Sequence, residues 1–454
     1  MSADTSAAPN PVLAAASWLG AAATRRVLGA LEAEGHRARV VGGAVRNALL
    51  GRPVTDVDIA TEAVPGTVLR LAERAGLKAV PTGIAHGTVT VIADGVPFEV
   101  TTLRRDVETH GRHATVAFTD DWRADAERRD FTMNALYCDA GGVVFDYVGG
   151  LADLERARVR FIGDAHARIR EDYLRILRFF RFAAEYGEGK IDAGGLEACL
   201  AERAGLAQLS AERIRAELLK LLAARHVLAV LDVMHAPGLL GEIVGSAPDV
   251  RTHRRLHGTT RTILQVARDM DGDASAGADI RPSPSGSPEP RAPGSAEVTP
   301  LLALAALAVH TVADADDLMQ RLRLSRAERD RLAAFAAVAA GVASLPAEPA
   351  ALQARVREIG YRHGDAAVDG LRLAWARSGE PVNDVRWATA VIAAARLQPL
   401  QLPVGGADVV ALGIAPGPRV GVLLDAFEAW WIAAGFPDDA ERNLVQLEHL
   451  ARGP

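Results

Sequence analysis

The chain has little cysteine and no long apolar run, and these two absences bound its class. Its two cysteines, Cys138 and Cys199, have no metal-ligand spacing, which argues against a disulfide scaffold and a zinc finger. No segment approaches the ~20 apolar residues that a membrane span needs. The beginning of the sequence lacks the basic lead-in and apolar stretch of a secretory signal. We therefore expect a cytoplasmic protein with no membrane segment.

The chain also lacks a broad excess of positive charge. Its formal net charge is −6 at pH 7, so any contact to nucleic-acid phosphates depends on local clusters of Lys and Arg. Of its 454 residues, 49% are hydrophobic. At roughly 100–200 residues per domain, this length predicts about two to four globular domains.

The pattern of the sequence changes near residue 150. Before it, short strand-like segments alternate with helices, and after it, stretches rich in Leu, Ala, Arg and Glu have helical periodicity. A Pro-, Ser- and Gly-rich segment in the second half cannot bury enough apolar surface to offset its ordering entropy, so we expect a disordered insertion. The predicted organisation is 1–150, a domain of strands and helices with a helical lead-in; 151–270, a helical domain; 271–300, the insertion; and 301–454, a second helical domain. The predicted strands are 38–41, 54–59, 88–92, 98–102 and 143–147, and the main predicted helices are 12–34, 44–50, 65–75, 168–184, 211–224 and 303–340.

The most informative stretch is an apolar strand, 38–41, that ends at Gly42 and Gly43 and is followed by Arg46. A diglycine turn after a strand lets backbone N–H groups approach a triphosphate. On its own, such a turn is often only a tight connection to the following helix. The next residues decide between the two interpretations.

Two acidic residues, Asp56 and Asp58, follow at once. Residues i and i+2 of a strand point to one face, so the predicted strand 54–59 would present both carboxylates together. Carboxylates are hard oxygen ligands for Mg²⁺, which stabilises the charge that develops when a hydroxyl attacks an α-phosphate. Glu99, on another strand-like segment between Phe98 and Val100, is expected as a third catalytic carboxylate. The alternative for such acids is the solvent-facing side of a strand.

A second polar cluster runs from Arg128 to Asn134. Arg129 can pair with a phosphate, and Asp130 and Asn134 can hydrogen-bond a ribose hydroxyl. The alternative is an Arg–Asp pair that caps a helix.

The third cluster lies on the predicted helix that contains residues 171–181. At ~100° per residue, its charged residues sweep one half of the helix and its apolar residues gather on the other. An aspartate acceptor beside an arginine donor fork, here Asp172 with Arg175 and Arg178, can address the Watson–Crick edge of a base. Arg181 lies opposite Asp172 on this helix and is better placed for a phosphate. A solvated face of salt bridges is the structural alternative.

A further segment predicts a helix start, with Ser210 as its N-cap. Arg213, in the first turn of that helix, is a candidate contact to RNA or phosphate.

Taken in order, these motifs resemble those of class II tRNA nucleotidyltransferases, the family of CCA-adding enzymes and bacterial poly(A) polymerases. The resemblance covers residues 38–220. It implies an α+β fold, with a polymerase-beta-like nucleotidyltransferase head in residues 1–150 followed by an all-α neck, body and tail. In this arrangement residues 151–270 form the neck and body that bind the nucleotide base and RNA, and residues 301–454 form the body and tail that bind RNA. It also implies that the chain grips the acceptor arm of tRNA and adds CMP and AMP from CTP and ATP to its 3′ end without a nucleic-acid template.

The resemblance also implies roles for individual residues. Asp56 and Asp58 would bind Mg²⁺, and residues 104–119 around Gly111 match the position of a flexible loop that helps to switch specificity from C to A. The implied nucleotide-binding residues are Gly42, Gly43, Arg46, Arg129, Asp130, Asp172, Arg175, Arg178 and Arg181.

The sequence departs from the family pattern in two places. Asn47 stands where family members commonly have aspartate, which affects its local hydrogen bonds. No His-Asp dipeptide occurs in the chain, so we expect no metal phosphohydrolase activity. We interpret His253, His257 and His310 as ordinary packing or surface histidines.

We therefore predict a Mg²⁺-dependent CCA-adding nucleotidyltransferase. A poly(A) polymerase, or a partial enzyme that adds only CC or only A, is the enzymatic alternative. A non-catalytic RNA-binding protein is the alternative from another class. The oligomeric state does not follow from the sequence.

Overall fold

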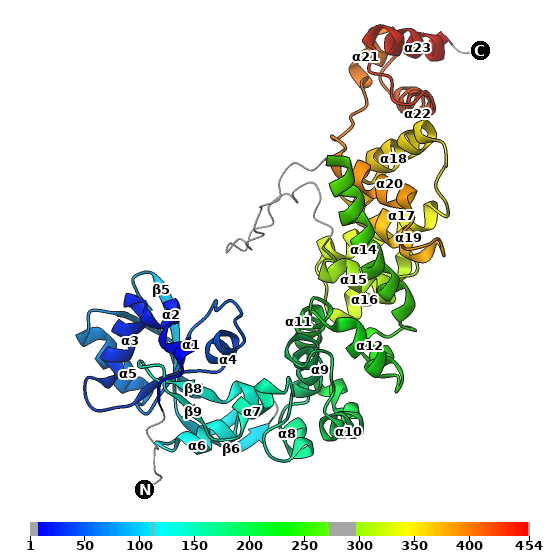
Figure 1. Cartoon of the computed structure of the whole chain (residues 1–454). Helices are drawn as coiled ribbons and strands as arrows, with labels where there is room; N and C mark the ends of the chain where they lie inside the picture. Colours follow the sequence, from blue (N-terminus) through cyan, green and yellow to red (C-terminus); the bar gives the residue numbers. More distant parts are fainter. Residues whose placement is uncertain (1–7, 111–112, 272–296, 453–454) are drawn as a thin grey trace. The chain divides into compact units, whose positions relative to one another are not determined.

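The computed structural model describes residues 8–110, 113–271 and 297–452, without the side chains of residues 106–115 and 271. The chain divides into two compact units, Met1–Ile243 and Val244–Pro454 (Figure 1). The predicted boundaries at residues 150, 270 and 300 lie inside these units and stay predictions. Residues 272–296 of the predicted insertion and Gly111 of the predicted loop lie outside the described residues.

A seven-stranded mixed sheet forms the centre of the first unit, and its strand order is β3-β4-β5-β2-β1-β8-β9. A separate two-stranded sheet is formed by the antiparallel pair β6 and β7 within the predicted loop segment. The strands are β1 (Ala38–Val41), β2 (Asp58–Thr61), β3 (Lys78–Gly83), β4 (Thr88–Ala93), β5 (Val96–Thr102), β6 (Arg104–His110), β7 (His113–Phe118), β8 (Leu136–Cys138) and β9 (Val144–Asp146).

The central strand β1 is buried along its whole length, because both faces of the sheet are covered here. Helices α3 (Ala22–Glu32) and α5 (Pro65–Arg74) pack against each other and against β4, and α4 (Gly43–Leu49) packs against β1. These elements confirm the predicted strand 38–41 and the predicted helices 44–50 and 65–75. The predicted lead-in 12–34 forms three helices, since extended backbone at Ala16 and Ala21 interrupts it. They are α1 (Pro11–Ala14), α2 (Ser17–Gly20) and α3.

The first unit continues with short helices. The predicted helix 168–184 is interrupted: α8 ends at Glu171, Asp172 has extended backbone, and α9 begins at Leu174. Helix α9 packs against α11, which begins after Ser210 as predicted. The remaining elements of this unit are η1 (Ile84–His86), α6 (Trp122–Glu127), η2 (Thr132–Asn134), α7 (Gly150–Glu155), α8 (Ala165–Glu171), α9 (Leu174–Tyr186), α10 (Ala193–Ala201), η3 (Arg203–Gln208), α11 (Ala211–Leu222), α12 (Val227–His235) and α13 (Leu239–Val244), which ends in the second unit.

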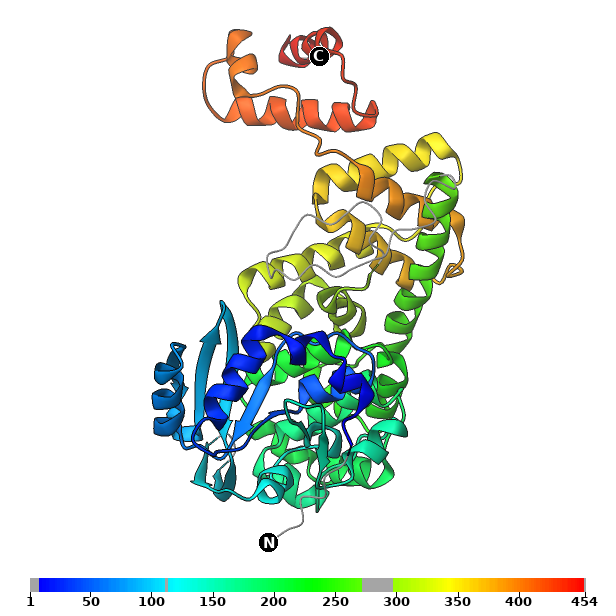
Figure 2. The same ribbon diagram turned by 60° about the vertical axis from the view of Figure 1, so that its left-hand side comes forward.

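In the described part of the second unit every regular element is a helix, as predicted (Figure 2). One core holds Trp375 and Trp387, whose stacked rings lie 6.4 Å apart. A smaller core near the C-terminus is built around Phe427 and Trp431. The helices are α14 (Val250–Asp271), α15 (Pro300–Ala308), α16 (Val312–Leu322), α17 (Arg326–Gly341), α18 (Pro349–His363), α19 (Ala366–Arg377), α20 (Val385–Arg396), α21 (Gly406–Ala411), α22 (Pro418–Ala433) and α23 (Ala440–Arg452).

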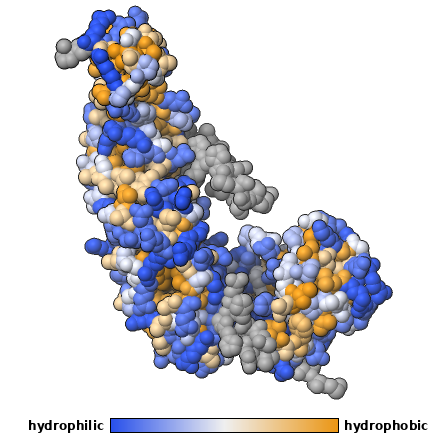
Figure 3. All heavy atoms as spheres, turned by 180° about the vertical axis from the view of Figure 1, so that it is seen from behind, coloured by the Kyte–Doolittle hydropathy of each residue, from blue (hydrophilic) through white to orange (hydrophobic). Residues whose placement is uncertain are grey.

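The surface of the second unit is mixed in polarity. Figure 3 shows hydrophobic surface among polar side chains on the C-terminal helices, a segment in which Val422 and Val445 are exposed. His253 is fully buried and His310 is exposed, as expected of packing and surface histidines. Among the described residues, none of the helices combines the length and apolar character needed to cross a membrane.

Candidate active site

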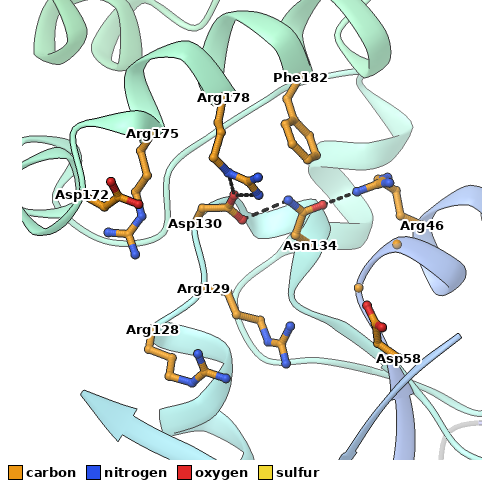
Figure 4. A pocket seen from close by; sticks show the side chains of 12 residues that line it. Arg46, Asp58, Arg128, Arg129, Asp130, Asn134, Asp172, Arg175, Arg178 and Phe182 are labelled. Atoms are coloured by element: carbon orange, nitrogen blue, oxygen red, sulfur yellow. Dashed lines mark hydrogen bonds and ion pairs between the residues drawn. The ribbon is translucent and has the colours of Figure 1, made fainter. Parts of the chain in front are cut away.

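A pocket of about 380 Å³ lies in the first unit between the diglycine bend and helix α9 (Figure 4). Most of the predicted nucleotide-binding residues line it, and so does the predicted metal ligand Asp58. Arg128 and Phe182 also line the pocket and were not predicted to bind. The lining residues are Gly42, Gly43, Arg46, Asp58, Arg128, Arg129, Asp130, Asn134, Asp172, Arg175, Arg178 and Phe182.

The bend at the end of β1 requires glycine at its first position. Gly42 has φ +71° and ψ −116°, a conformation that residues with a side chain rarely adopt. A Cβ atom at this position would lie 3.4 Å from the carbonyl oxygen of Asn134 and 3.9 Å from Nη1 of Arg129. The bare backbone therefore brings the bend close to the polar cluster that forms the opposite wall of the pocket.

Sheet register places Asp58 beside this bend. Asp58 is the first residue of β2, where it lies opposite Val41 of β1, the residue before Gly42. On its other side, Asp58 is in register with Glu99 of the parallel strand β5. Residues in register on neighbouring strands point to the same face, and the flanking Phe98 and Val100 are buried. The predicted strand position of Glu99, with Phe98 and Val100 on the opposite face, is therefore confirmed. Glu99 does not line the pocket, and its catalytic role stays a prediction.

The prediction that Asp56 lies on one strand with Asp58 is wrong. Strand β2 begins at Asp58, and Asp56 lies in the exposed segment before it, where its Oδ2 accepts a hydrogen bond from Oγ1 of Thr55 (3.0 Å). Strand β1 ends at Val41, opposite Asp58, so it offers no partner to Asp56.

The charges of these acids act on one another. Burial raises the pKa of Asp58 above its ordinary value, and the negative charges of Glu99 and Asp56 raise it further, while Arg129 lowers it. Such repulsion is what a bound divalent cation relieves.

A metal site here would depend on ligands from outside the protein. Within the described part of the chain, no group of three or more His, Cys, Asp or Glu side chains is arranged to hold a metal ion. Mg²⁺ is commonly bound by one or two carboxylates together with substrate phosphates and water. Asp58 with Asp56 nearby fits that donor set, because their oxygens are hard ligands and, among the side chains that the structure describes, neither forms an ion pair.

Arg129 is anchored at the base of the pocket by a buried acid. Its Nη2 donates to Oδ2 of Asp125 (3.0 Å) and its Nε donates to the hydroxyl of Tyr137 (3.2 Å). The other carboxylate oxygen of Asp125 accepts from Nε of Arg128 (2.8 Å). Burial acts to raise the pKa of Asp125, but the two arginines more than offset this effect and hold it well below its usual value. Asp125 therefore fixes two cations on the pocket wall.

Asp130 and Arg178 form an ion pair across the pocket. Nε and Nη2 of Arg178 donate to Oδ2 of Asp130 at 2.9 and 2.5 Å, and Nδ2 of Asn134 donates to the other oxygen (2.9 Å). Burial acts to raise the pKa of Asp130, but Arg178 and the hydrogen bonds more than offset this effect and lower the pKa to about 2. In this structure the two residues predicted to bind the nucleotide bind each other.

The prediction that Asp172 lies on the same helix face as the arginines is also wrong. Asp172 connects α8 to α9: its Oδ1 accepts from the backbone N–H of Leu174 (3.1 Å), and its Oδ2 accepts from Nη2 of Arg213 on α11 (2.7 Å). The helix breaks because the carboxylate caps α9, as aspartate does at a helix start. Arg175 on α9 forms an ion pair with Glu171. Asp172 and Arg175 nevertheless both reach the pocket.

Arg181 does not line the pocket. Its Nε donates to Oε2 of the buried Glu217 on α11 (2.6 Å). The positive charge of Arg181 is therefore neutralised by an acid of the protein. Phe182, the next residue, has the guanidinium groups of Arg181 and Arg46 at 4.4 and 5.3 Å from its ring centre. Phe182 lies four positions after Arg178, and residues at this spacing share a helix face, which is the sequence pattern that places Phe182 beside the pocket.

The fold, an α+β head followed by helices, is the one that the resemblance implied, and the pocket brings most of the predicted nucleotide-binding residues together. Residues 38–160 match the family described as "Poly A polymerase head domain", and residues 190–250 match that described as "Probable RNA and SrmB- binding site of polymerase A". The head therefore resembles the poly A polymerase head-domain family, and the predicted resemblance to class II tRNA nucleotidyltransferases is confirmed.

Named relatives match about half of the chain. CCA tRNA nucleotidyltransferase 1, mitochondrial, of Mus musculus is 46% identical over 213 residues, which are 46% of this chain and 49% of the relative. The CCA-adding enzyme of Bacillus pumilus is 40% identical over 225 residues, which are 49% of this chain and 55% of the relative. The chain thus spans about half the length of the curated relatives it matches.

Solved structures extend the likeness along the chain. The crystal structure of Bacillus stearothermophilus CCA-adding enzyme in complex with CTP matches 98% of both chains with a TM-score of 0.69 and 26% identity. Thermotoga maritima CCA-adding enzyme complexed with tRNA matches 93% of both chains with a TM-score of 0.61 and 18% identity, which shows the common fold.

Proposed function

We propose that this protein is a CCA-adding tRNA nucleotidyltransferase that transfers CMP and AMP from CTP and ATP to the 3′ end of tRNA without a nucleic-acid template. The observation that supports this most strongly is the pocket itself, where the diglycine bend and Asp58 meet the Asp172 and Arg175 segment. One end fits a triphosphate and the other fits a base. A cytoplasmic location remains a prediction from the cysteine content.

The base end supports the choice of C and A. Both bases carry an amino donor beside a ring-nitrogen acceptor on the Watson–Crick edge, whereas U and G carry the opposite order. An acceptor from Asp172 beside donors from Arg175 and Arg178 is complementary to C and A alike. The same side chains can therefore serve both nucleotides.

The reacting end supports metal-assisted transfer. Asp56 and Asp58 would hold Mg²⁺, which supplies neutralisation of the charge that develops on the attacking and leaving oxygens. The backbone at Gly42 and Gly43 would contact the triphosphate, and Arg129, held by Asp125, would offset its charge. The attacking 3′-hydroxyl of the RNA forms the new bond to the α-phosphorus as pyrophosphate leaves.

The test is transfer of labelled CMP and AMP to tRNA that lacks its terminal CCA. We expect Asp58→Ala to reduce transfer by at least a hundredfold, because loss of a metal ligand removes several kcal/mol of transition-state stabilisation. Asp120→Ala is the matched control, since Asp120 is exposed and lies outside the pocket. Transfer by Asp58→Ala at the rate of this control would refute the proposal.

A poly(A) polymerase is the second candidate, because the head matches a family described by that activity. The length of the RNA product distinguishes a CCA-adding enzyme from a poly(A) polymerase. CTP and ATP together should give a product that stops after three nucleotides under the first proposal, whereas a long product from ATP alone would favour the second. Incubation with CTP alone or ATP alone also identifies a partial enzyme that adds only CC or only A.

A further inference from the structure

One side chain, the amide of Asn134, joins the two ends of the pocket. Its oxygen accepts a hydrogen bond from Nη1 of Arg46, and its nitrogen donates to Oδ1 of Asp130 (2.9 Å). The other oxygen of Asp130 accepts two hydrogen bonds from Arg178. Figure 4 shows this chain of contacts running from Arg46 through Asn134 and Asp130 to Arg178.

The two cations at the ends of this chain belong to different parts of the site. Arg46 lies on α4, directly after the diglycine bend, and Arg178 lies on α9 next to Arg175. Both line the same pocket. This row of side-chain contacts therefore connects the proposed triphosphate end of the pocket with the proposed base end.

The Arg46 end of this row of contacts is well shielded from water. Arg46 is 7% exposed and Asn134 is 9% exposed, so solvent competes little for their hydrogen bonds. Arg46 is held on its other side by the hydroxyl of Tyr186 (2.8 Å) and by the side-chain oxygen of Asn47. Its guanidinium has no freedom to turn without breaking several contacts at once.

We propose that Asn134 is a positioning residue that holds Arg46 and, through Asp130, Arg178 in one network, so that nucleotide selection depends on the two ends of the pocket being set together. This inference rests on the proposed function. It assigns Asn134 a role beyond contact with a ribose hydroxyl, because both polar atoms of its amide have partners within the protein.

An amide on a side chain of this length meets both requirements of the position. Asn134 accepts from a cation on one side and donates to a carboxylate on the other. An aspartate in its place keeps the acceptor for Arg46 but has no donor for Asp130, and it brings a second negative charge beside that carboxylate. The resulting repulsion would displace Asp130 and release Arg178 from its fixed orientation.

The experiment compares Asn134→Asp with Asn47→Asp in the full chain. The side-chain oxygen of Asn47 also accepts a hydrogen bond from Arg46. Its amide nitrogen donates to the backbone carbonyl of Pro53 (3.1 Å), which is not part of the row of contacts from Arg46 to Arg178. Both variants make the same chemical change beside the same arginine. The readouts are equilibrium binding of labelled CTP and UTP, and the ratio of CMP to UMP transfer to tRNA lacking its end.

We expect Asn134→Asp to lower the preference for CTP over UTP by about tenfold, the effect of losing a hydrogen bond to a charged group, while Asn47→Asp retains the wild-type preference. Equal preferences in the two variants, with any loss shared by all nucleotides, would overturn the inference. A wild-type chain that shows no preference would contradict the proposed function itself, and the inference with it.

Folding is monitored by thermal unfolding of each variant. If Asn134→Asp does not fold, Asn134→Ser takes its place, because a serine hydroxyl can donate and accept but reaches less far than the amide. We expect Asn134→Ser to lower the preference as well, and a wild-type preference in that variant would refute the role of Asn134.

Discussion

The two ends of the pocket are held by different means. At the triphosphate end, backbone conformation and sheet register fix the geometry: Gly42 makes the bend, and pairing of β2 with β1 places Asp58 beside it. At the base end, side-chain ion pairs fix the geometry, as in Arg178 with Asp130 and Asp172 with Arg213. The first end should therefore be sensitive to backbone strain, and the second to charge and pH.

The largest effect on stability is expected from Gly42→Ala. An alanine at φ +71° and ψ −116° costs about 2–3 kcal/mol of unfolding free energy, within the range for residues forced into sparsely populated conformations. The strain would also move the bend and weaken CTP binding. Urea unfolding and CTP binding measure the two effects.

Gly43→Ala is the matched control for that substitution. Gly43 lies within α4 without a positive φ, and a Cβ there would approach only Nη2 of Arg46, at 3.8 Å. Alanine in a helix is more favourable than glycine, so the stability of Gly43→Ala should equal or exceed that of the wild type. Equal losses in the two variants would contradict the proposed importance of the bend conformation.

The next effect concerns charge at the base end, and Asp130→Asn tests it. The pKa of Asp130 is about 2 in the folded chain, below its ordinary value of 3.8. Its carboxylate therefore contributes about 2 kcal/mol of stability at neutral pH. That contribution is fully present above about pH 4 and is lost as the pH falls toward 2.

The measurement is the unfolding free energy of wild type and Asp130→Asn at pH 7 and pH 3. We expect the wild type to exceed the variant by about 2 kcal/mol at pH 7 and by less at pH 3. Asp120→Asn serves as the control, since Asp120 is exposed. A difference that does not change with pH would show that the ion pair with Arg178 is not its source.

The same contrast explains what could be predicted from the sequence. The bend and the strand positions of Asp58 and Glu99 follow from local patterns, because glycine marks the turn and alternation sets the strand face. The register that places Asp58 beside Glu99 joins strands distant in the sequence and does not follow from such patterns. The error at Asp56 arose at the end of a strand, because pairing with a distant strand determines where the strand begins. The error at Asp172 arose because its carboxylate competes with the helix for backbone N–H groups.

The partners of the base-end residues could not be predicted. Arg213, Glu217 and Asp130 are far from their partners in the sequence, and any of several acids could have neutralised each arginine. The choice depends on how α9 and α11 pack, which periodicity does not specify. Asn134 was recognised as polar and well placed, but only the structure shows that both of its polar atoms bind other residues of the pocket.

The smallest effect on stability is expected from Arg213→Met, which removes the partner of Asp172 on α11. The side chains of this pair are 24% and 21% exposed, so its loss should cost less than about 1 kcal/mol of unfolding free energy. Methionine keeps the length and helix propensity of the side chain. A carboxylate that loses one of its two fixed contacts samples more orientations, so the affinity for CTP and ATP should fall severalfold while the stability hardly changes. Glu212→Gln, exposed in the same helical turn, is the control for surface charge. If Arg213→Met bound both nucleotides as the control does, the orientation of Asp172 would be set by its cap on α9 alone, and the base end would depend on backbone structure as the triphosphate end does.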